Sequence, residues 1–250
     1  MLIVRLESPF YALTQKLYMD DSYIKRCDTK VRGIQGNQAT FESTVLHPLS
    51  GGVANDLGKV AWHETLYDVI DVEEDKSTGD VIHVLSRTPY FNIGDAIEIT
   101  LDWDRRYALM KLHTAAHILS SIMYSKYGAL ITGGHIDPDV AKDDFNIEKA
   151  DKQLFEGAID EVNAIVSKAI EVKAYYLPRD RALEIPGIVK LADKMPPESR
   201  ELRIVEIVGI DVQADGGPHV RNTSEIGNIV LLRVENKGKS RKRVYYGIKE

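Results

Sequence analysis

The chain has 250 residues, of which 44% are hydrophobic and 28% charged, and its formal net charge is −6. This composition is typical of a globular protein with one large domain or two small ones, and the negative charge argues against generic nucleic-acid binding. No apolar run reaches the length of a membrane span, no signal peptide precedes the first charged residue, and the single cysteine, Cys27, excludes a disulfide framework, so a cytoplasmic location is expected.

The first hundred residues are predicted to form mostly short strands. Runs of strand-forming residues recur at regular spacing and are separated by polar or glycine-containing turns. The predicted strands are Leu2–Leu6, Tyr23–Arg32, Ala39–Leu46, Lys59–Asp71, Asp80–Leu85 and Ala96–Leu101. Many short strands at this spacing indicate a small antiparallel β-barrel, so we expect residues 1–101 to form a barrel domain.

A glycine-rich loop, residues 47–58, interrupts these strands and reads His-Pro-Leu-Ser-Gly-Gly-Val-Ala-Asn-Asp-Leu-Gly. Gly51 and Gly52 permit a tight loop and a close approach of the backbone to a ligand. The same residues fit a plain turn equally well, and both interpretations stay open at this point.

The stretch Trp103–Tyr127 is predicted to be a helix, because apolar residues recur at helical spacing and neither Pro nor Gly occurs before Gly128. His113 and His117 lie four residues apart and therefore on one face, where two imidazoles can bind one metal ion. The pair alone is weak support for a metal site. It is also not the metalloprotease helix, because Thr114 stands where that motif requires Glu.

Further candidate ligands occur about a hundred residues later. Asp215 and His219 flank a Gly-Gly-Pro turn, which can direct both side chains toward one point. Three histidines and one carboxylate form a plausible zinc site. We therefore predict that His113, His117, Asp215 and His219 bind one divalent metal ion, zinc in the first instance.

The remaining chain mixes helices with antiparallel strands, which predicts an α+β domain over residues 102–250. The predicted helices are Ala150–Ala169, which is amphipathic, and the short segment Pro178–Leu183. The predicted strands are Ala129–Thr132, one ending at Asp143–Phe145, Glu171–Leu177, Leu202–Val208 and a final hairpin of Asn228–Glu235 with Arg243–Ile248. Residues 185–201 are predicted to be irregular.

These motifs together resemble the AlaX family, free-standing relatives of the editing domain of alanyl-tRNA synthetase that also resemble the second domain of threonyl-tRNA synthetase. The resemblance rests on the His-x-x-x-His helix, on Asp-Gly-Gly-Pro-His-Val-Arg-Asn-Thr-Ser-Glu-Ile-Gly at 215–227, and on Pro48, Gly51, Gly52, Asp56 and Gly58 of the loop. Gly-Gly-His-Ile, Asp-Asp-Phe and the closing Gly-Lys-Ser-Arg-Lys-Arg-Val-Tyr-Tyr also match. The match covers nearly the whole chain and is nearest to the medium-length form, which has a barrel before the catalytic domain.

Three departures from the family pattern bear on the site. Asp215 replaces the usual Cys ligand, and a carboxylate is a harder zinc ligand than a thiolate. Pro218 replaces a Thr and removes a hydroxyl that could support a ligand. Val53 and Ala54 replace Gln-Pro in the loop, so no amide side chain can make a contact there.

The resemblance implies trans-editing, the hydrolysis of serine or glycine wrongly esterified to alanine tRNA, by a metal-dependent aminoacyl-tRNA deacylase that needs no ATP. Such editing is useful because a pocket sized for alanine rejects the serine hydroxyl poorly. A zinc-bound water is the expected nucleophile, with no separate general base assigned. In the alternative mechanism, the metal holds the amino or hydroxyl group of the substrate while another group directs a free water. The predicted substrate-binding residues are Thr132, Gly134 and Gln213. The predicted RNA-binding residues are Gly51, Gly52, Lys239, Arg241, Lys242 and Arg243.

Two other functions stay open. The first is a metal-stabilised tRNA-binding protein without hydrolytic activity, in which the missing Cys marks lost catalysis. The second is a hydrolase acting on a free small molecule, which is compatible with an acidic chain that has one basic cluster. An assay with mischarged tRNA separates the first from a deacylase, and shortening the tRNA to its terminal nucleotide tests the second.

Overall fold

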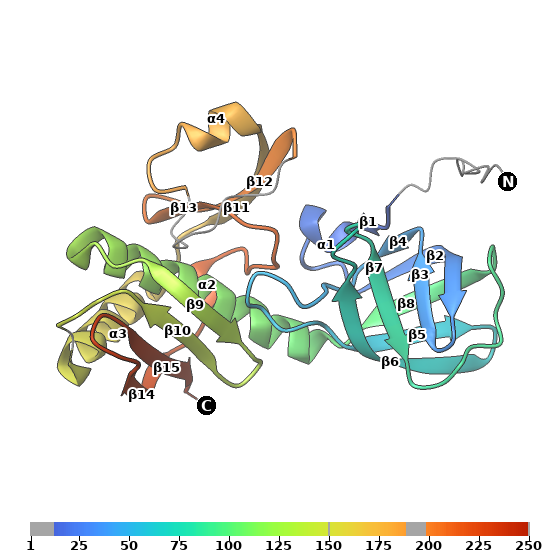
Figure 1. The fold of residues 1–250 in the computed structure, drawn as a ribbon, viewed down its shortest axis with the longest axis horizontal. Helices are drawn as coiled ribbons and strands as arrows, with labels where there is room; N and C mark the ends of the chain where they lie inside the picture. Colours follow the sequence, from blue (N-terminus) through green and yellow to red (C-terminus); the bar gives the residue numbers. More distant parts are fainter. Residues whose placement is uncertain (1–12, 150, 189–198, 250) are drawn as a thin grey trace, which may run out of the picture.

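The structure is a computed structural model that describes residues 13–149, 151–188 and 199–249. Figure 1 shows a closed β-barrel at one end of the molecule and, at the other, two helices with two smaller sheets. The predicted strand Leu2–Leu6 lies outside the described residues. Within the described ranges, no helix is long and apolar enough to cross a lipid bilayer.

Six antiparallel strands close the barrel in the order β2-β3-β7-β6-β5-β8. They are β2 Arg26–Gln35, β3 Gln38–Phe41, β5 Gly58–Trp62, β6 Thr65–Glu74, β7 Val81–Leu85 and β8 Ala96–Leu101. Inward-facing residues such as Val60, Tyr67 and Ile99 are fully buried, which gives the barrel a core of its own. The short strands β1 Gln15–Lys16 and β4 Ser43–Thr44 pair in parallel, and α1 Leu17–Asp20 follows β1.

Two of the predicted barrel strands are each divided in two in the structure. The predicted strand Lys59–Asp71 is two paired strands, β5 and β6, with a turn at His63, whose φ is 50°. The turn lacks the Asn-Gly or Asp-Gly pair that marks two-residue hairpins, so the hairpin has no clear signal in the sequence. The predicted strand Ala39–Leu46 is also divided, into β3 and β4.

The second half confirms the α+β prediction and contains a four-stranded antiparallel sheet in the order β14-β15-β10-β9. Its strands are β9 Ile131–Ile136, β10 Ala141–Phe145, β14 Ile229–Asn236 and β15 Lys242–Ile248. A second, three-stranded sheet comprises β11 Val172–Pro178, β12 Glu201–Ile207 and β13 Asp211–Ala214, of which β13 was not predicted. The remaining elements are α2 Trp103–Tyr127, α3 Lys152–Val166, α4 Arg179–Leu183 and η1 Thr223–Glu225. Helices α2 and α3 pack on each other and against the four-stranded sheet (Figure 1).

Helix α2 has the bounds that its sequence predicts. The side chain of Asp102 accepts a hydrogen bond from the backbone N–H of Arg105 and caps the N-terminus. Gly128, with φ of 62°, ends the helix in the left-handed conformation that glycine adopts without strain. The histidines are therefore held on a long helix with both ends defined.

A buried ion pair attaches the barrel to the start of α2. The Arg106 guanidinium contacts the Asp56 carboxylate, and both side chains are fully buried. The same guanidinium donates to the carbonyls of Ser22 at 2.9 Å and Val45 at 2.7 Å. The loop residue Asp56 therefore has a structural role, because its loss would leave a buried cation without its anion.

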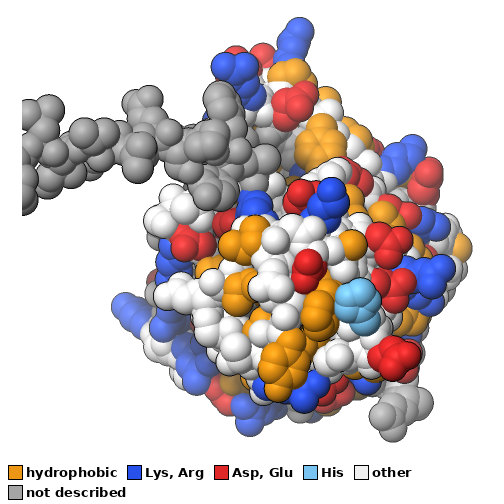
Figure 2. Space-filling view, turned by 90° about the vertical axis from the view of Figure 1, so that its right-hand side faces the viewer, with side chains coloured by type: hydrophobic (Ala, Val, Ile, Leu, Met, Phe, Trp, Pro, Cys, Tyr) orange, Lys and Arg blue, Asp and Glu red, His pale blue; other side chains and the backbone are white. Residues whose placement is uncertain are grey.

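Positive and negative side chains are mixed at the barrel end of the molecule. Figure 2 shows that Lys and Arg side chains are interspersed there with Asp and Glu around hydrophobic and uncharged groups. Proteins bind the phosphates of RNA where positive side chains are in local excess. This face shows no such excess, so it is not favoured as an RNA-binding surface.

Candidate metal centre and its pocket

Helix α2 supplies two of the four predicted ligands. His113 and His117 are 5% and 6% exposed, so both imidazoles lie within the protein rather than on its surface. Their four-residue spacing places them one turn apart on the face of α2 that points to the turn after β13.

The turn after β13 supplies the other two ligands, Asp215 and His219. The Asp215 carboxylate accepts a hydrogen bond of 2.7 Å from the backbone N–H of Gly217. The buried guanidinium of Arg203 donates to the carbonyls of Asp215 at 3.0 Å and Gly217 at 2.9 Å. A Cβ at Gly217 would lie 2.7 Å from the His113 ring, so the turn can approach the helix this closely only with glycine.

The structure brings the four predicted side chains together. One ligand atom from each of His113, His117, Asp215 and His219 lies within 4.8 Å of the other three. The Nε2 atoms of the histidines lie 3.5, 3.7 and 3.3 Å, respectively, from the Asp215 carboxylate. This group, which we call the His/Asp cluster, has the donor atoms of a zinc site, and its residues can hold a metal ion.

Hydrogen bonds on the far side of the two helix histidines orient their rings. His113 Nδ1 lies 3.3 Å from the carbonyl oxygen of Pro218, and His117 Nδ1 lies 3.2 Å from Asp211 Oδ2. Both partners are acceptors, so each Nδ1 carries the proton and donates it. The proline that replaces the family's Thr thus still supports a ligand, through its carbonyl.

The third histidine is oriented in the same way. His219 Nδ1 lies 3.1 Å from Thr114 Oγ1, whose own proton is donated to the Met110 carbonyl at 2.9 Å. The Thr114 hydroxyl can therefore only accept from His219 Nδ1. All three imidazoles consequently direct Nε2 at the cluster, and a second hydrogen bond that fixes the tautomer is typical of metal-binding histidines.

Without metal, the cluster favours a protonated His117 beside an ionised Asp215. Burial by itself would lower the pKa of His117, but its bonds to Asp211 and Asp215 raise it to about 9. Burial would raise the pKa of Asp215, but the charge of His113 and hydrogen bonds from all three histidines hold it well below its ordinary value. A cation that binds at His117 Nε2 must therefore displace a proton, which makes its affinity fall at low pH.

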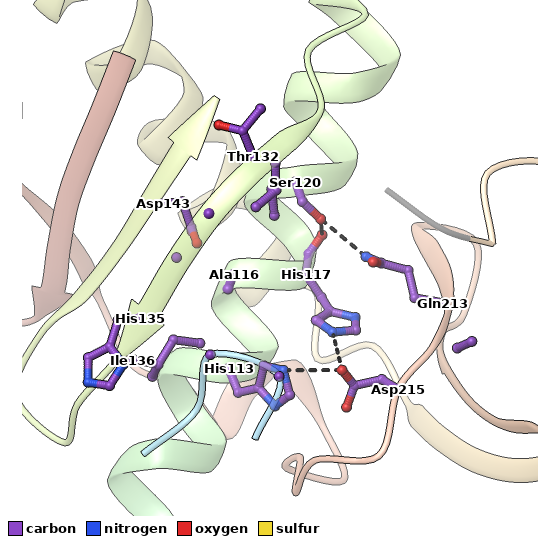
Figure 3. A pocket seen from close by; sticks show the side chains of 16 residues that line it. His113, Ala116, His117, Ser120, Thr132, His135, Ile136, Asp143, Gln213 and Asp215 are labelled. Carbon is purple, nitrogen blue, oxygen red and sulfur yellow. Dashed lines mark hydrogen bonds and ion pairs between the residues drawn. The ribbon is translucent and has the colours of Figure 1, made fainter. Parts of the chain in front are cut away.

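A cavity of about 110 Å³ opens beside the cluster (Figure 3). Its walls come from α2, β9, β10, the β13 turn and the glycine-rich loop. All of the predicted substrate-binding residues line it, as do both loop glycines: Thr132, Gly134, Gln213, Gly51 and Gly52. The cavity is small in comparison with sites for drug-sized ligands, and it suits an amino-acid group.

The glycine-rich loop is docked on β9. The Ile136 N–H donates to the Gly52 carbonyl at 2.7 Å, and the Ala54 N–H donates to the Ile136 carbonyl at 2.9 Å. Val53 and Ala54, which replace Gln-Pro, are buried in the core of the second half. The loop therefore forms part of the cavity wall, and its apolar pair packs where an amide would be poorly accommodated.

Gln213 is buried rather than displayed on the strand. Its side-chain amide donates to Asp211 Oδ2 at 2.8 Å and to Ser120 Oγ at 3.2 Å. Thr132, in contrast, is exposed at the cavity wall, where its hydroxyl donates to the Asp144 carbonyl at 3.3 Å. Through its bond to Asp211, Gln213 therefore holds the carboxylate that orients the His117 ring.

The four predicted RNA-binding cations differ in environment. Lys239 and Arg241 are exposed in the turn between β14 and β15. Lys242 is only 9% exposed and donates to Asn236, and Arg243 forms a two-bond ion pair with Asp144. Only the first two present their charge at the tip of the hairpin.

Sequence reasoning missed two buried acids near the cavity, Asp211 and Asp143. Asp211 stands two residues before Gln213 in β13, so alternation turns both side chains to the same, buried face of the strand. Asp143 lies between Ala141 and Phe145 on the inward face of β10. The sequence signal that could have identified both acids is a carboxylate at a strand position that faces inward.

Comparisons with known proteins agree with this architecture. Residues 202–245, which include the turn after β13, match the family described as the Threonyl and Alanyl tRNA synthetase second additional domain. The chain is 52% identical over 239 residues to the Alanyl-tRNA editing protein AlaX-M of Saccharolobus solfataricus, a match that covers 95% of this chain and 100% of that protein. It is 32% identical over 243 residues to the AlaX-M protein of Methanosarcina mazei, covering 94% and 97%.

A match to a larger protein is also found. The chain is 33% identical over 223 residues to the Alanine--tRNA ligase of Ignicoccus hospitalis, which covers 88% of this chain but 24% of the ligase. The chain belongs to the AlaX-M family of alanyl-tRNA editing proteins.

Proposed function

We propose that this chain is a trans-editing hydrolase that removes serine or glycine from mischarged alanine tRNA in the cytoplasm. Water adds to the ester carbonyl carbon, the bond to the terminal ribose oxygen breaks, and the amino acid and the tRNA are released. The observation that carries the proposal is the His/Asp cluster, which opens into a cavity of amino-acid size in a chain of the AlaX-M family.

The proposed cofactor is one zinc ion held by His113, His117, Asp215 and His219. Three imidazole nitrogens and a carboxylate oxygen suit zinc, and the neighbouring acceptors at Nδ1 direct each Nε2 toward the site, where binding at His117 displaces a proton. When bound, the ion supplies Lewis-acid activation for ester hydrolysis. The chain itself needs no ATP for this reaction.

The residues around the cavity position the substrate. Thr132 presents a hydroxyl at the wall, and Gly134 leaves room for a ligand beside it. Gln213 acts through Asp211, whose carboxylate holds His117 in its ring orientation.

The tRNA is proposed to contact both parts of the chain, a barrel domain of residues 1–101 and an editing domain of residues 102–250. Gly51 and Gly52 line the cavity that the 3′ end must reach. Lys239 and Arg241, which are exposed in the β14–β15 turn, are the proposed phosphate-binding residues, and Lys242 and Arg243 belong to the same hairpin. Phosphate contacts predict affinity that weakens as salt rises.

A deacylation assay tests the proposal. Metal-loaded protein is expected to hydrolyse Ser-tRNA(Ala) and Gly-tRNA(Ala) and to leave Ala-tRNA(Ala) largely intact, and atomic absorption is expected to give one zinc per chain. A His113→Ala variant with intact folding serves as the control and should lose both properties. Binding of mischarged tRNA by the zinc-loaded protein without hydrolysis would overturn the proposal in favour of a tRNA-binding protein.

A further inference from the structure

One buried acid in the cavity has no part in the His/Asp cluster. Asp143, the third residue of β10, is 4% exposed and lines the cavity. Its Oδ2 accepts a hydrogen bond of 2.7 Å from the hydroxyl of Tyr246, another buried residue. In Figure 3, Asp143 lies apart from the cluster, with Ala116 between them in the view.

The other carboxylate oxygen is exposed to the cavity by the lack of a side chain at Gly134. A Cβ at Gly134 would lie only 2.7 Å from Asp143 Oδ1. This distance is too short for a carbon atom in van der Waals contact, so any larger residue at 134 would cover the oxygen. The glycine therefore keeps an anionic acceptor accessible beside the cavity.

The neighbouring acid shows what Asp143 lacks. Asp144 has a cation, Arg243, which donates to both of its oxygens at 2.6 and 2.8 Å. Among the described residues, no Lys, Arg or His side chain forms an ion pair with Asp143. Burial, with the charge of Asp144, raises the pKa of Asp143 to about 6, while the hydrogen bond from Tyr246 and the more distant charge of His117 oppose this rise, so the group is still mainly ionised at neutral pH.

A buried carboxylate without a directly contacting cation is costly to maintain, because desolvation removes its stabilisation by water. Perturbed and unpaired buried acids occur preferentially in binding and catalytic sites. An aminoacyl ester brings its own cation, since an α-amino group with a pKa of about 7.7–8.0 is largely protonated at pH 7. Such a ligand would supply the missing charge.

We propose that Asp143 is a substrate-binding residue that binds the α-ammonium group of the aminoacyl ester through Oδ1. The inference rests on the proposed function. It adds selection for the α-amine of the ester, which the His/Asp cluster does not provide. With the ester carbonyl at the cluster and the ammonium group at Asp143, the site recognises an ester with a free α-amine. The contact serves seryl and glycyl esters alike, because the amine is common to both.

The test compares esters that differ only at the α-position. In glycolyl-tRNA(Ala) a hydroxyl replaces the α-amine of glycyl-tRNA(Ala), with almost no change of size. The zinc-loaded wild-type protein is expected to prefer the glycyl ester in kcat/KM. Asp143→Asn should lower kcat/KM for the glycyl ester about 10- to 100-fold, the effect of losing one charged hydrogen bond, and should leave the glycolyl ester within about two-fold.

Two further measurements separate this inference from the proposed function. Zinc content should be unchanged in Asp143→Asn, because the residue is not a ligand, and Ser-tRNA(Ala) should lose activity by the same factor as Gly-tRNA(Ala). A loss confined to the seryl ester would mean that Asp143 binds the serine hydroxyl, and it would overturn the proposal. An unchanged preference for glycyl over glycolyl ester in the variant would also overturn it, whereas an inactive wild-type protein would instead contradict the proposed function.

A binding readout covers the case in which the wild-type protein is inactive. Glycinamide and glycolamide, titrated into the zinc-loaded protein by NMR, carry the same difference of amine and hydroxyl. Preferential binding of glycinamide that is lost in Asp143→Asn supports the proposal, and equal binding of the two probes by wild-type protein contradicts it.

Discussion

The histidines of the barrel half and those of the His/Asp cluster are all buried, but they differ in whether the ring nitrogen Nδ1 has a hydrogen-bond partner. In the barrel, His83 is fully buried and packs against Phe41, with Nε2 2.8 Å from Thr44 Oγ1. His47, in the glycine-rich loop, is 1% exposed, with Nε2 3.3 Å from Ser50 Oγ. In the described structure, Nδ1 of both residues is buried without a hydrogen-bond partner.

In the cluster, each histidine instead has an acceptor at Nδ1 and directs Nε2 toward a shared point. Burial therefore does not distinguish a functional histidine from a core histidine in this molecule. The distinction lies in whether the second nitrogen is fixed so that the first can bind a ligand.

The largest expected effect follows from removing cluster imidazoles. A His113→Ala, His117→Ala double variant is expected to lose its metal ion and all detectable hydrolysis, because two of the four ligands are missing. Metal analysis and deacylation of Ser-tRNA(Ala) measure the two effects. His83→Leu is the matched control and should keep both, and an unchanged metal stoichiometry in the double variant would refute the ligand assignment.

The barrel histidines are expected to weaken the fold in acid. Burial lowers the pKa of both His47 and His83 to about 4, below the ordinary value of 6.5. Between these values the unfolded chain binds more protons, so stability is fully present above pH 6.5 and falls as the pH drops toward 4. Each histidine should account for up to about 3 kcal/mol of unfolding free energy.

Urea unfolding at pH 7 and pH 5 measures this dependence. The His83→Leu protein should show a smaller fall between the two pH values than wild type, since one of the two titrating groups has been removed. An identical fall in the two proteins would show that His83 takes up no proton on unfolding.

The cavity acid Asp143 is expected to act in the opposite direction. Its pKa is raised from 3.8 to about 6, so the folded protein binds more protons than the unfolded chain between these values. Its destabilising effect therefore develops as the pH rises through this window and is complete above about pH 6. Asp143→Asn should stabilise the fold by up to about 3 kcal/mol at pH 7.5 and by much less near pH 4.

Thermal or urea unfolding of this variant at the two pH values gives the comparison. Asp144→Asn is the contrasting variant. Arg243 lowers the pKa of Asp144, so removing the Asp144 carboxylate should destabilise the fold. A destabilised Asp143→Asn protein at pH 7.5 would mean that the ionised carboxylate has a stabilising partner.

A smaller effect is expected from the residue behind His117. In Asp211→Asn the acceptor of the His117 Nδ1 proton loses its charge, while the side chain keeps its size. Metal affinity should fall about 10- to 100-fold, the usual range for such supporting groups. Competition with a chelator measures the affinity, and unaltered affinity together with unaltered activity would argue against an orienting role.

The smallest effect concerns the two glycines of the loop. Both have positive φ, 61° for Gly51 and 90° for Gly52, but a Cβ at Gly51 meets nothing within 4 Å. A Cβ at Gly52 would lie 3.2 Å from the Gly134 carbonyl, against the cavity wall. Gly52→Ala should therefore slow deacylation several-fold more than Gly51→Ala, because its Cβ meets the cavity wall and because a φ of 90° strains alanine more than a φ of 61° does. Equal rates in the two variants would show that the loop does not shape the cavity.

Short-range features were determined by the sequence itself. The spacing of apolar residues, the cap at Asp102 and the glycine at 128 define α2, because helix formation and termination depend on residues within a few positions. The four-residue spacing of His113 and His117 and the turn between Asp215 and His219 follow from the same local geometry. The ligand candidates could therefore be identified before any tertiary contact was known.

Only the tertiary structure decided which of these residues meet, and what else meets them. The Asp211 carboxylate, the Pro218 carbonyl and the Thr114 hydroxyl fix the histidine tautomers through contacts across about a hundred residues of chain, which no local pattern records. The docking of the glycine-rich loop on β9 and the absence, among the described residues, of an ion pair at Asp143 likewise depend on how distant strands pack. Ligand spacing is a property of one helix or one turn, whereas the shape and charge of a cavity belong to all the elements that enclose it.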